Sequence, residues 1–161
     1  MPTAQPAAGQ TPEQALDALG ITLPAPTAPL AAYVPVVTAG GFAFVSGQGP
    51  LRDGQAVALG RLGAEVSPEL GYEAARVAAI NILAQLKAAL GSLDQVAQVV
   101  KLTVMVASTP EFTGHPAVAN GASELLAQVF GDAGRHARSA FGVAALPLNW
   151  PVEVDAIVQL R

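Results

Sequence analysis

The spacing of apolar residues predicts a long helix in the middle of the chain. From residue 67 to residue 91, leucine, isoleucine, valine and alanine fall mainly on one broad helical face. Ser67 can cap the first turn, Pro68 suits the first helical position, and Gly91 provides a stop. The segments on either side contain short runs rich in β-branched residues, which are typical of strands.

Six strands and two main helices are therefore expected, in the order β-β-β-α-β-α-β-β. The strands are predicted within residues 33–48 (a hairpin that turns at 39–41), 49–63, 96–108 and 136–160. The last segment is expected to hold two strands joined by a turn at Pro147–Pro151. The second helix is predicted at residues 115–131, interrupted or started at Asn120-Gly121. This order favours the α+β class, with a mixed six-stranded sheet and two main helices on one face.

The first 32 residues differ from the rest of the chain. Residues 1–10 have the composition of a tail. Thr11, Pro12 and Gln14 then carry the start signals of a short N-terminal helix. A proline-rich stretch follows and predicts an extended connector. The expected organisation is therefore a tail, short helix and connector at 1–32, followed by one domain at 33–161.

Composition restricts the possible partners. With 161 residues, 52% hydrophobic and 12% charged, the chain has few polar residues to cover its surface. Since no predicted element is left to cover the second face of the sheet, we expect self-association. A net charge of −4 with only eight Lys and Arg argues against nucleic-acid binding. No signal peptide or membrane span is evident, so a soluble cytoplasmic protein is expected.

Several kinds of chemistry find no support in the sequence. The chain has no cysteine, which excludes disulfides and thiolate sites. Its two histidines, His115 and His136, are too few and too far apart to predict a metal site. Ser46 lacks the surroundings of a nucleophile elbow, and Gly47-Gln48-Gly49 is not a phosphate-binding loop. Neither a metal nor another cofactor is expected.

Arg138 and Glu153 stand out because the residues between them carry no charge. Arg138 could form a structural ion pair, or it could offer a planar fork of donors to a substrate carboxylate. If the two C-terminal strands form a hairpin, Arg138 lies about 20 Å from Glu153, at about 3.3 Å per residue. On this hypothesis the two charges meet across an interface between subunits.

Four segments together resemble the YjgF family, also called the reactive intermediate deaminases or Rid proteins. They are YVPVVTAGGFAFVSGQGPL, VAQVVKLTVMVASTPEF, HARSAFGVAALP and VEVDAI, and they run from about Tyr33 to Leu160 in the family's order. The ANGASELL and GRHARSA segments indicate a distinct, longer branch. The resemblance implies a chorismate-mutase-like fold, assembled as a homotrimer with active sites between subunits.

The resemblance also implies roles for individual residues. Arg138 matches the carboxylate-binding arginine of the family, and Glu153 matches the acidic residue that orients the attacking water. Further substrate-binding positions implied in the same way are Tyr33, Ser46, Gly47, Asn120 and Ala140. Ala140 departs from the family pattern, which often has cysteine there.

The implied activity is hydrolysis of short-lived enamine or imine acids, such as 2-aminoacrylate, to 2-keto acids and ammonia. An imine carbon is already electrophilic, so an arginine to hold the acid and a carboxylate to move a proton are sufficient. The alternative is a non-enzymatic binder of small carboxylates that uses the same cleft. An endoribonuclease, an activity attached to the family by name, is disfavoured by the net charge of −4.

Overall fold

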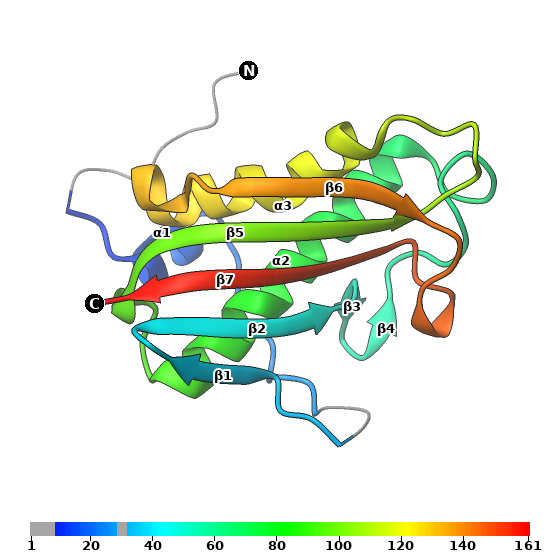
Figure 1. Ribbon diagram of the computed structural model, residues 1–161. Helices are drawn as coiled ribbons and strands as arrows, with labels where there is room; N and C mark the ends of the chain where they lie inside the picture. The colour runs from blue at the N-terminus through cyan, green and yellow to red at the C-terminus, as the bar shows by residue number, and fades with distance from the viewer. Residues whose placement is uncertain (1–8, 29–31) are drawn as a thin grey trace.

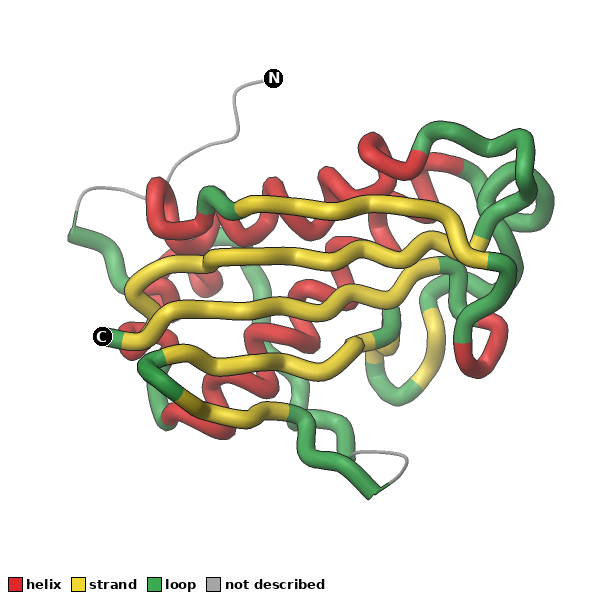
Figure 2. Tube along the Cα trace, in the orientation of Figure 1, coloured by secondary structure: helices red, strands yellow, loops and turns green. Residues whose placement is uncertain are grey.

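A mixed sheet of five strands forms one layer of the molecule, and two long helices form the other (Figure 1). The computed structural model describes residues 9–28 and 32–161. The strand order is β1-β2-β7-β5-β6. The bounds are β1 (Val36–Ala39), β2 (Phe42–Gln48), β5 (Val96–Ala107), β6 (Ala137–Val143), β7 (Val152–Leu160), α2 (Pro68–Leu90) and α3 (His115–Phe130). Both helices lie on the same face of the sheet (Figure 2), which confirms the predicted α+β arrangement.

The main sheet has five strands and not the six that were expected. The expected third strand instead forms a separate hairpin of two short strands, β3 (Leu51–Arg52) and β4 (Gln55–Ala56). Asp53 and Gly54 form the turn between them, with φ angles of 52° and 78°. Because this tight turn pairs β3 with β4 locally, neither strand is available to extend the main sheet.

The two C-terminal strands do not form the predicted hairpin. β6 runs parallel to β5, whereas β7 runs antiparallel to β5 on its other side. The connection contains η3 (Pro147–Asn149), where Leu148 and Asn149 have φ angles of 54° and 61°. The chain thus passes the end of β5 before it returns. Since α3 is a crossover connection from β5, β6 has to be parallel to β5, and a β6–β7 hairpin is not formed.

The predicted helix signals are confirmed for α2 and for the short helix α1 (Pro12–Ala18). Thr11 and Gln14 form a complete capping box at the start of α1. The Ser67 side chain accepts a hydrogen bond from the backbone N–H of Leu70, and Gly91 ends α2 with a φ of 82°. α1 is attached to the body of the protein, because Leu16 is only 3% exposed and belongs to the hydrophobic core.

α3 is one continuous helix, so the interruption expected at Asn120-Gly121 is wrong. A Cβ at Gly121 would overlap the backbone carbonyl oxygen of Tyr72 in α2. The glycine is therefore present because the two helices approach closely, and it does not break the helix. Tyr72 also donates a hydrogen bond from its hydroxyl to Glu124 of α3, at 2.8 Å.

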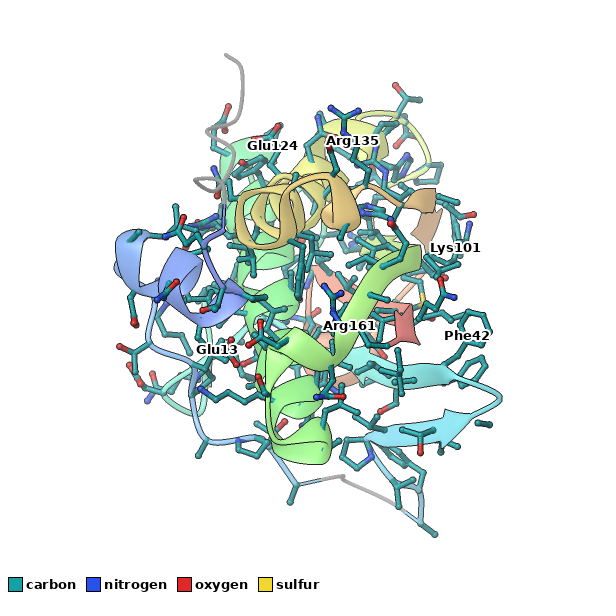
Figure 3. All side chains as sticks on the ribbon, turned by 90° about the vertical axis from the view of Figure 1, so that its left-hand side faces the viewer. Glu13, Phe42, Lys101, Glu124, Arg135 and Arg161 are labelled. Carbon is teal, nitrogen blue, oxygen red and sulfur yellow. The ribbon has the colours of Figure 1, made fainter. Side chains whose placement is uncertain are left out.

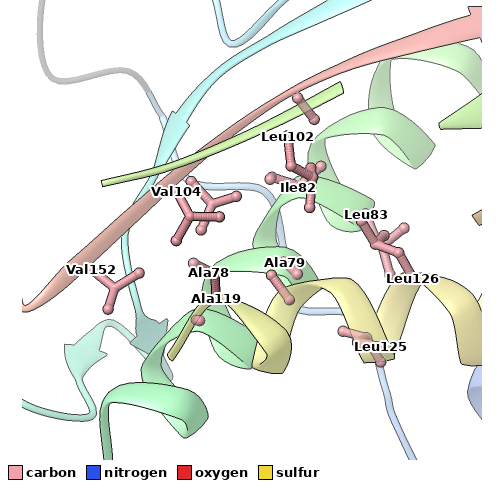
Figure 4. Packing of buried hydrophobic residues seen from close by; sticks show 14 of the residues in the cluster. Ala78, Ala79, Ile82, Leu83, Leu102, Val104, Ala119, Leu125, Leu126 and Val152 are labelled. Carbon is pink, nitrogen blue, oxygen red and sulfur yellow. The ribbon is translucent and has the colours of Figure 1, made fainter. Parts of the chain in front are cut away.

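The core fills the space between the sheet and the two helices (Figure 4). Leu102, Val104 and Val152 contribute from the sheet. Small side chains on α2, such as Ala78 and Ala79, allow the helix to pack closely against its neighbours. No helix in the described ranges is long and apolar enough to cross a membrane.

None of the helices in residues 9–28 and 32–161 covers the other face of the sheet (Figure 1). Phe42 and Lys101 point to this side, away from α1 and α2 (Figure 3). Phe44 of β2 and Phe141 of β6 are 43% and 45% exposed. This face therefore presents large apolar side chains to the surroundings of the single chain.

Candidate functional site

A cavity of about 570 Å³ opens where β2 ends. Tyr33, Gly47 and Glu153 all line it, together with Gln48 and Trp150. The sequence predictions placed the first three of these residues in the binding site. They come from the segment before β1, from β2 and from β7, which are distant in the sequence and adjacent in the fold.

A β-bulge and two glycines shape this end of β2. The register between β2 and β7 shifts between Val45 and Gln48. A Cβ at Gly47 would overlap Oε1 of Glu153, and a Cβ at Gly49 would overlap the ring of Trp150. Each glycine thus makes room for a larger side chain of the cavity wall. Ser46, the residue before, donates a hydrogen bond from Oγ to the carbonyl of Pro35, at 3.2 Å.

Three buried amide side chains support the wall of this cavity, and none of them was predicted from the sequence as a site residue. Asn81 donates from Nδ2 to the carbonyls of Gly49 and Leu51, at 2.9 and 3.0 Å. Gln85 donates from Nε2 to the carbonyl of Thr27, at 2.8 Å. Gln48 is the third, and all three are 5–6% exposed. The signal in the sequence was a pair of amides four residues apart on the apolar face of α2, a position that demands hydrogen-bond partners.

Glu153 is a half-buried carboxylate on the cavity wall. Burial, and to a lesser extent the nearby charge of Asp155, raise its pKa above the usual value of 4.5. Within the described part of the chain, neither oxygen of Glu153 is hydrogen-bonded or ion-paired to another residue. A carboxyl group with a raised pKa holds its proton more strongly than an exposed one, which suits it to proton transfer.

A second polar cluster surrounds Arg138 on β6. Nη1 of Arg138 donates to Oδ1 of Asn120 at 2.9 Å and to Oγ of Ser123 at 3.0 Å. Nη2 donates to the carbonyl of Pro116 at 3.4 Å. The three acceptors come from successive turns of α3 and form one stripe along it. The predicted residues Arg138 and Asn120 are therefore in direct contact.

The two clusters are separate within one chain. Arg138 is aligned with the buried Leu102 of β5, whereas Glu153 is aligned with Met105 of the same strand. Side chains three residues apart in a strand point to opposite faces, so Arg138 and Glu153 lie on opposite faces of the sheet. Neither Arg138 nor Asn120 lines the cavity that contains Glu153. The expectation that the two charges do not meet within one subunit agrees with this register, although the predicted hairpin behind it was wrong.

Ala140 lies two residues after Arg138 and is aligned with Val104. Its methyl group packs against the hydrophobic core. The side chain thus occupies the helix-covered side of β6, and only the backbone of this residue remains for contact with a ligand.

Both histidines form hydrogen bonds at the ends of elements. Nε2 of His115, the first residue of α3, lies 3.0 Å from Oγ of Ser108. His136 lies just before β6, with Nε2 2.9 Å from Oγ of Ser123 and Nδ1 2.6 Å from the carbonyl of Gly134. In residues 9–28 and 32–161, no three side chains of the metal-binding types are grouped as a metal site.

The chain belongs to the YjgF/chorismate mutase-like, putative endoribonuclease family, whose model matches residues 13–160. A curated relative, Protein TCP17 of Trypanosoma cruzi, is 51% identical over 147 residues, which is 91% of this chain and 92% of that protein.

Solved structures with the same fold include proteins of several bacteria. Atu1372 of Agrobacterium tumefaciens, described as of unknown function, is 46% identical with a TM-score of 0.88, over 93% of this chain and 92% of its own. A putative endoribonuclease of Shewanella oneidensis is 37% identical with a TM-score of 0.91, over 94% and 100%. E. coli TdcF with bound serine is 25% identical with a TM-score of 0.62, over 87% and 95%.

Proposed function

We propose that this protein hydrolyses reactive enamine or imine acids, of the 2-aminoacrylate type, to 2-keto acids and ammonia. The observation that carries the proposal is the state of Arg138. One side of its guanidinium donates hydrogen bonds to residues of α3. Two N–H groups, Nε–H and one N–H of Nη2, have no acceptor among the described residues. Two adjacent N–H groups of an arginine match the two oxygens of a carboxylate.

Arg138 binds the carboxylate of the substrate and thereby fixes the position of the neighbouring imine carbon. The carboxylate is common to amino, imino and keto acids, so this contact persists from substrate to product. The E. coli TdcF structure contains serine, an amino acid that also carries this group. That observation supports a small carboxylate as the ligand of this fold.

Glu153 supplies the proton transfers. A water oxygen attacks the imine carbon while Glu153 accepts one of the water's protons and passes it to the imine nitrogen, giving a neutral carbinolamine. Glu153 then takes the proton of the carbinolamine hydroxyl and delivers it to the amino nitrogen, so that the C=O bond forms as the C–N bond breaks and ammonia leaves. Burial raises the pKa of Glu153, which makes its carboxylate a stronger base than an exposed one. Tyr33 and Gly47 line the same cavity as Glu153, and Ser46 donates a hydrogen bond to the carbonyl of Pro35, which also lines it.

The working site combines Arg138 of one copy with Glu153 of another, in a homotrimer. The separation of the two clusters within one chain supports this arrangement. The uncovered apolar face of the sheet, with Phe44 and Phe141, supports self-association through the sheet.

Ribonuclease activity appears in the names of the family and of the Shewanella relative. The chain carries only eight basic residues and a net charge of −4. Three of the eight, Arg52, Arg61 and Arg135, are already ion-paired with carboxylates. This charge distribution disfavours RNA, whose binding depends on neutralising phosphates.

A coupled assay tests the proposal. A PLP-dependent serine or threonine dehydratase generates the imine, and release of the 2-keto acid is followed with and without this protein. We expect wild type to accelerate the release and Arg138→Ala to abolish the acceleration. Arg135→Ala is the matched control, because Arg135 is highly exposed, forms an ion pair with the similarly exposed Asp132 and lies three residues away.

The three results of the assay have different meanings. Acceleration by wild type and Arg135→Ala, but not by Arg138→Ala, supports the deaminase. Saturable binding of pyruvate without acceleration would overturn the deaminase in favour of a carboxylate-binding protein. Cleavage of RNA that is lost in Arg138→Ala would favour the endoribonuclease.

A further inference from the structure

A chain of hydrogen bonds runs from Arg138 into the protein and ends at a backbone carbonyl. Nη1 of Arg138 donates to Oγ of Ser123, at 3.0 Å. The same oxygen lies 2.9 Å from Nε2 of His136. Nδ1 of His136 lies 2.6 Å from the carbonyl oxygen of Gly134. The four residues are thus linked in series. Of these four, only Arg138 has a role in the proposed reaction.

The two ends of this series decide which group donates and which accepts in each hydrogen bond. The Gly134 carbonyl can only accept, so Nδ1 of His136 carries a proton and donates it. In the neutral ring Nε2 then has a lone pair, which accepts the hydroxyl proton of Ser123. The Ser123 oxygen is left with its lone pairs facing Arg138, which can only donate. Each group has the one role that its neighbours require.

The neutral form of His136 agrees with its surroundings. Burial is the main cause that lowers the pKa of His136, and the positive charge of Arg138 lowers it further. The hydrogen bond to the Gly134 carbonyl raises the pKa; this effect is smaller than that of burial and larger than that of Arg138. The imidazole ring of His136 therefore stays neutral at neutral pH, where the carboxylate that Arg138 binds is ionised.

The arrangement follows from the positions of the residues on their elements. His136 and Arg138 are two residues apart where the chain enters β6, so their side chains can face the same way. Asn120 and Ser123 are three residues apart on α3 and therefore share one helical face. A Cβ at Gly134 would overlap the Leu126 carbonyl, so glycine is needed where this segment leaves α3.

We propose that Ser123 and His136 are positioning residues that orient the Arg138 guanidinium for the substrate. His136 fixes the Ser123 hydroxyl, and Ser123 together with Asn120 fixes both N–H groups of Nη1. The edge formed by Nε–H and Nη2–H is then held in one orientation. This inference rests on the proposed function, in which Arg138 binds the substrate carboxylate.

Disruptive and conservative variants at His136 provide the first test. In His136→Ala the Ser123 hydroxyl loses its acceptor, whereas in His136→Gln the side-chain Oε1 can still accept. We expect Ser123→Ala, which removes a hydrogen bond to the charged guanidinium, to raise KM for the imine about tenfold, with a smaller change in kcat. His136→Ala leaves the Ser123 hydroxyl unfixed and should raise KM in the same direction. His136→Gln should recover most of the lost affinity. Arg135→Ala again serves as the control with an unchanged KM.

A double-mutant cycle separates positioning from general structural damage. If Ser123 acts through Arg138, Ser123→Ala should weaken pyruvate binding in the wild-type background and have no further effect in an Arg138→Ala background. Methyl pyruvate, which has no carboxylate, should bind equally to all variants. Additive effects in the cycle, or an equal loss for methyl pyruvate, would overturn the proposal.

A direct observation of the guanidinium keeps this inference distinct from the proposed function. In wild type, the two Nη groups of Arg138 should give separate nitrogen NMR signals because their rotation is hindered. In Ser123→Ala and His136→Ala, the signals should broaden or merge. Unchanged signals in both variants would refute the positioning role even if wild type hydrolyses imines. Hindered rotation that the variants release, in a protein without imine hydrolysis, would uphold the positioning role and reject the deaminase.

Discussion

Glu153 is a residue whose ionisation opposes folding of the single chain. Burial and Asp155 raise its pKa, so the folded protein binds a proton at Glu153 more tightly than the unfolded chain does. Its stabilising contribution is complete below the usual pKa of 4.5 and is lost as the pH rises through the higher pKa of the folded state. Active sites commonly carry residues of this kind.

Glu153→Gln is therefore expected to raise Tm at neutral pH. Because both side chains are neutral in acid, the difference from wild type should vanish well below pH 4.5. Thermal unfolding of both proteins across this pH range measures the effect. If wild type is instead the more stable protein at neutral pH, an ion pair with a neighbouring copy outweighs the burial of Glu153.

At the level of single residues, the sequence indicated some partners and not others. Arg138 and Asn120 were both named as binding residues, and they share a hydrogen bond. The role of His136 was not predicted, since its contact with Ser123 joins two different elements. A charge in an apolar strand can be recognised in a sequence, but the partner of a neutral polar group depends on packing.

Among the elements, the pair of α2 and α3 shows most clearly why a local pattern can mislead. Gly121 suggested an interruption, because glycine disfavours helices by about 1 kcal/mol relative to alanine. In the structure α3 continues through it, and the glycine faces the Tyr72 carbonyl of α2. Close packing between two helices thus determines the residue at this position.

Gly121→Ala should destabilise the protein by about 1–3 kcal/mol, as expected for overpacking. The new methyl group meets backbone atoms of Tyr72, which cannot rotate away as a side chain could. Chemical denaturation with urea gives the free energy of unfolding. Helix propensity alone would make the variant more stable, so a rise in stability would show that α2 and α3 pack less closely than described.

On the proposed function, the whole molecule carries two different parts of one site. The Glu153 cavity lies at the end of β2, and the Arg138 cluster lies between β6 and α3. One chain alone does not bring them together, because they are on opposite faces of the sheet. In the proposed trimer each interface joins the two parts from neighbouring copies.

Mixed assemblies test this arrangement. Arg138→Ala and Glu153→Gln subunits are each expected to be inactive alone, yet an interface between the two variants can combine an intact Arg138 with an intact Glu153. For random mixing at equal amounts, about a quarter of the interfaces should be intact. Coexpression of the two variants, followed by the coupled imine assay, should therefore recover about that share of activity. Recovery of no activity from well-assembled mixtures would contradict a site shared between copies.

The amino-acid sequence by itself determined α1 and α2 with their caps, and most of the strand segments of this protein. Thr11 with Gln14, Ser67 and Gly91 act on neighbours within a few residues, so their effects can be recognised in the sequence alone. The tertiary structure decided the strand pairing, which places β5 between β6 and β7, and it decided which polar groups meet. Those contacts join residues from different elements, and their formation depends on how the whole core packs.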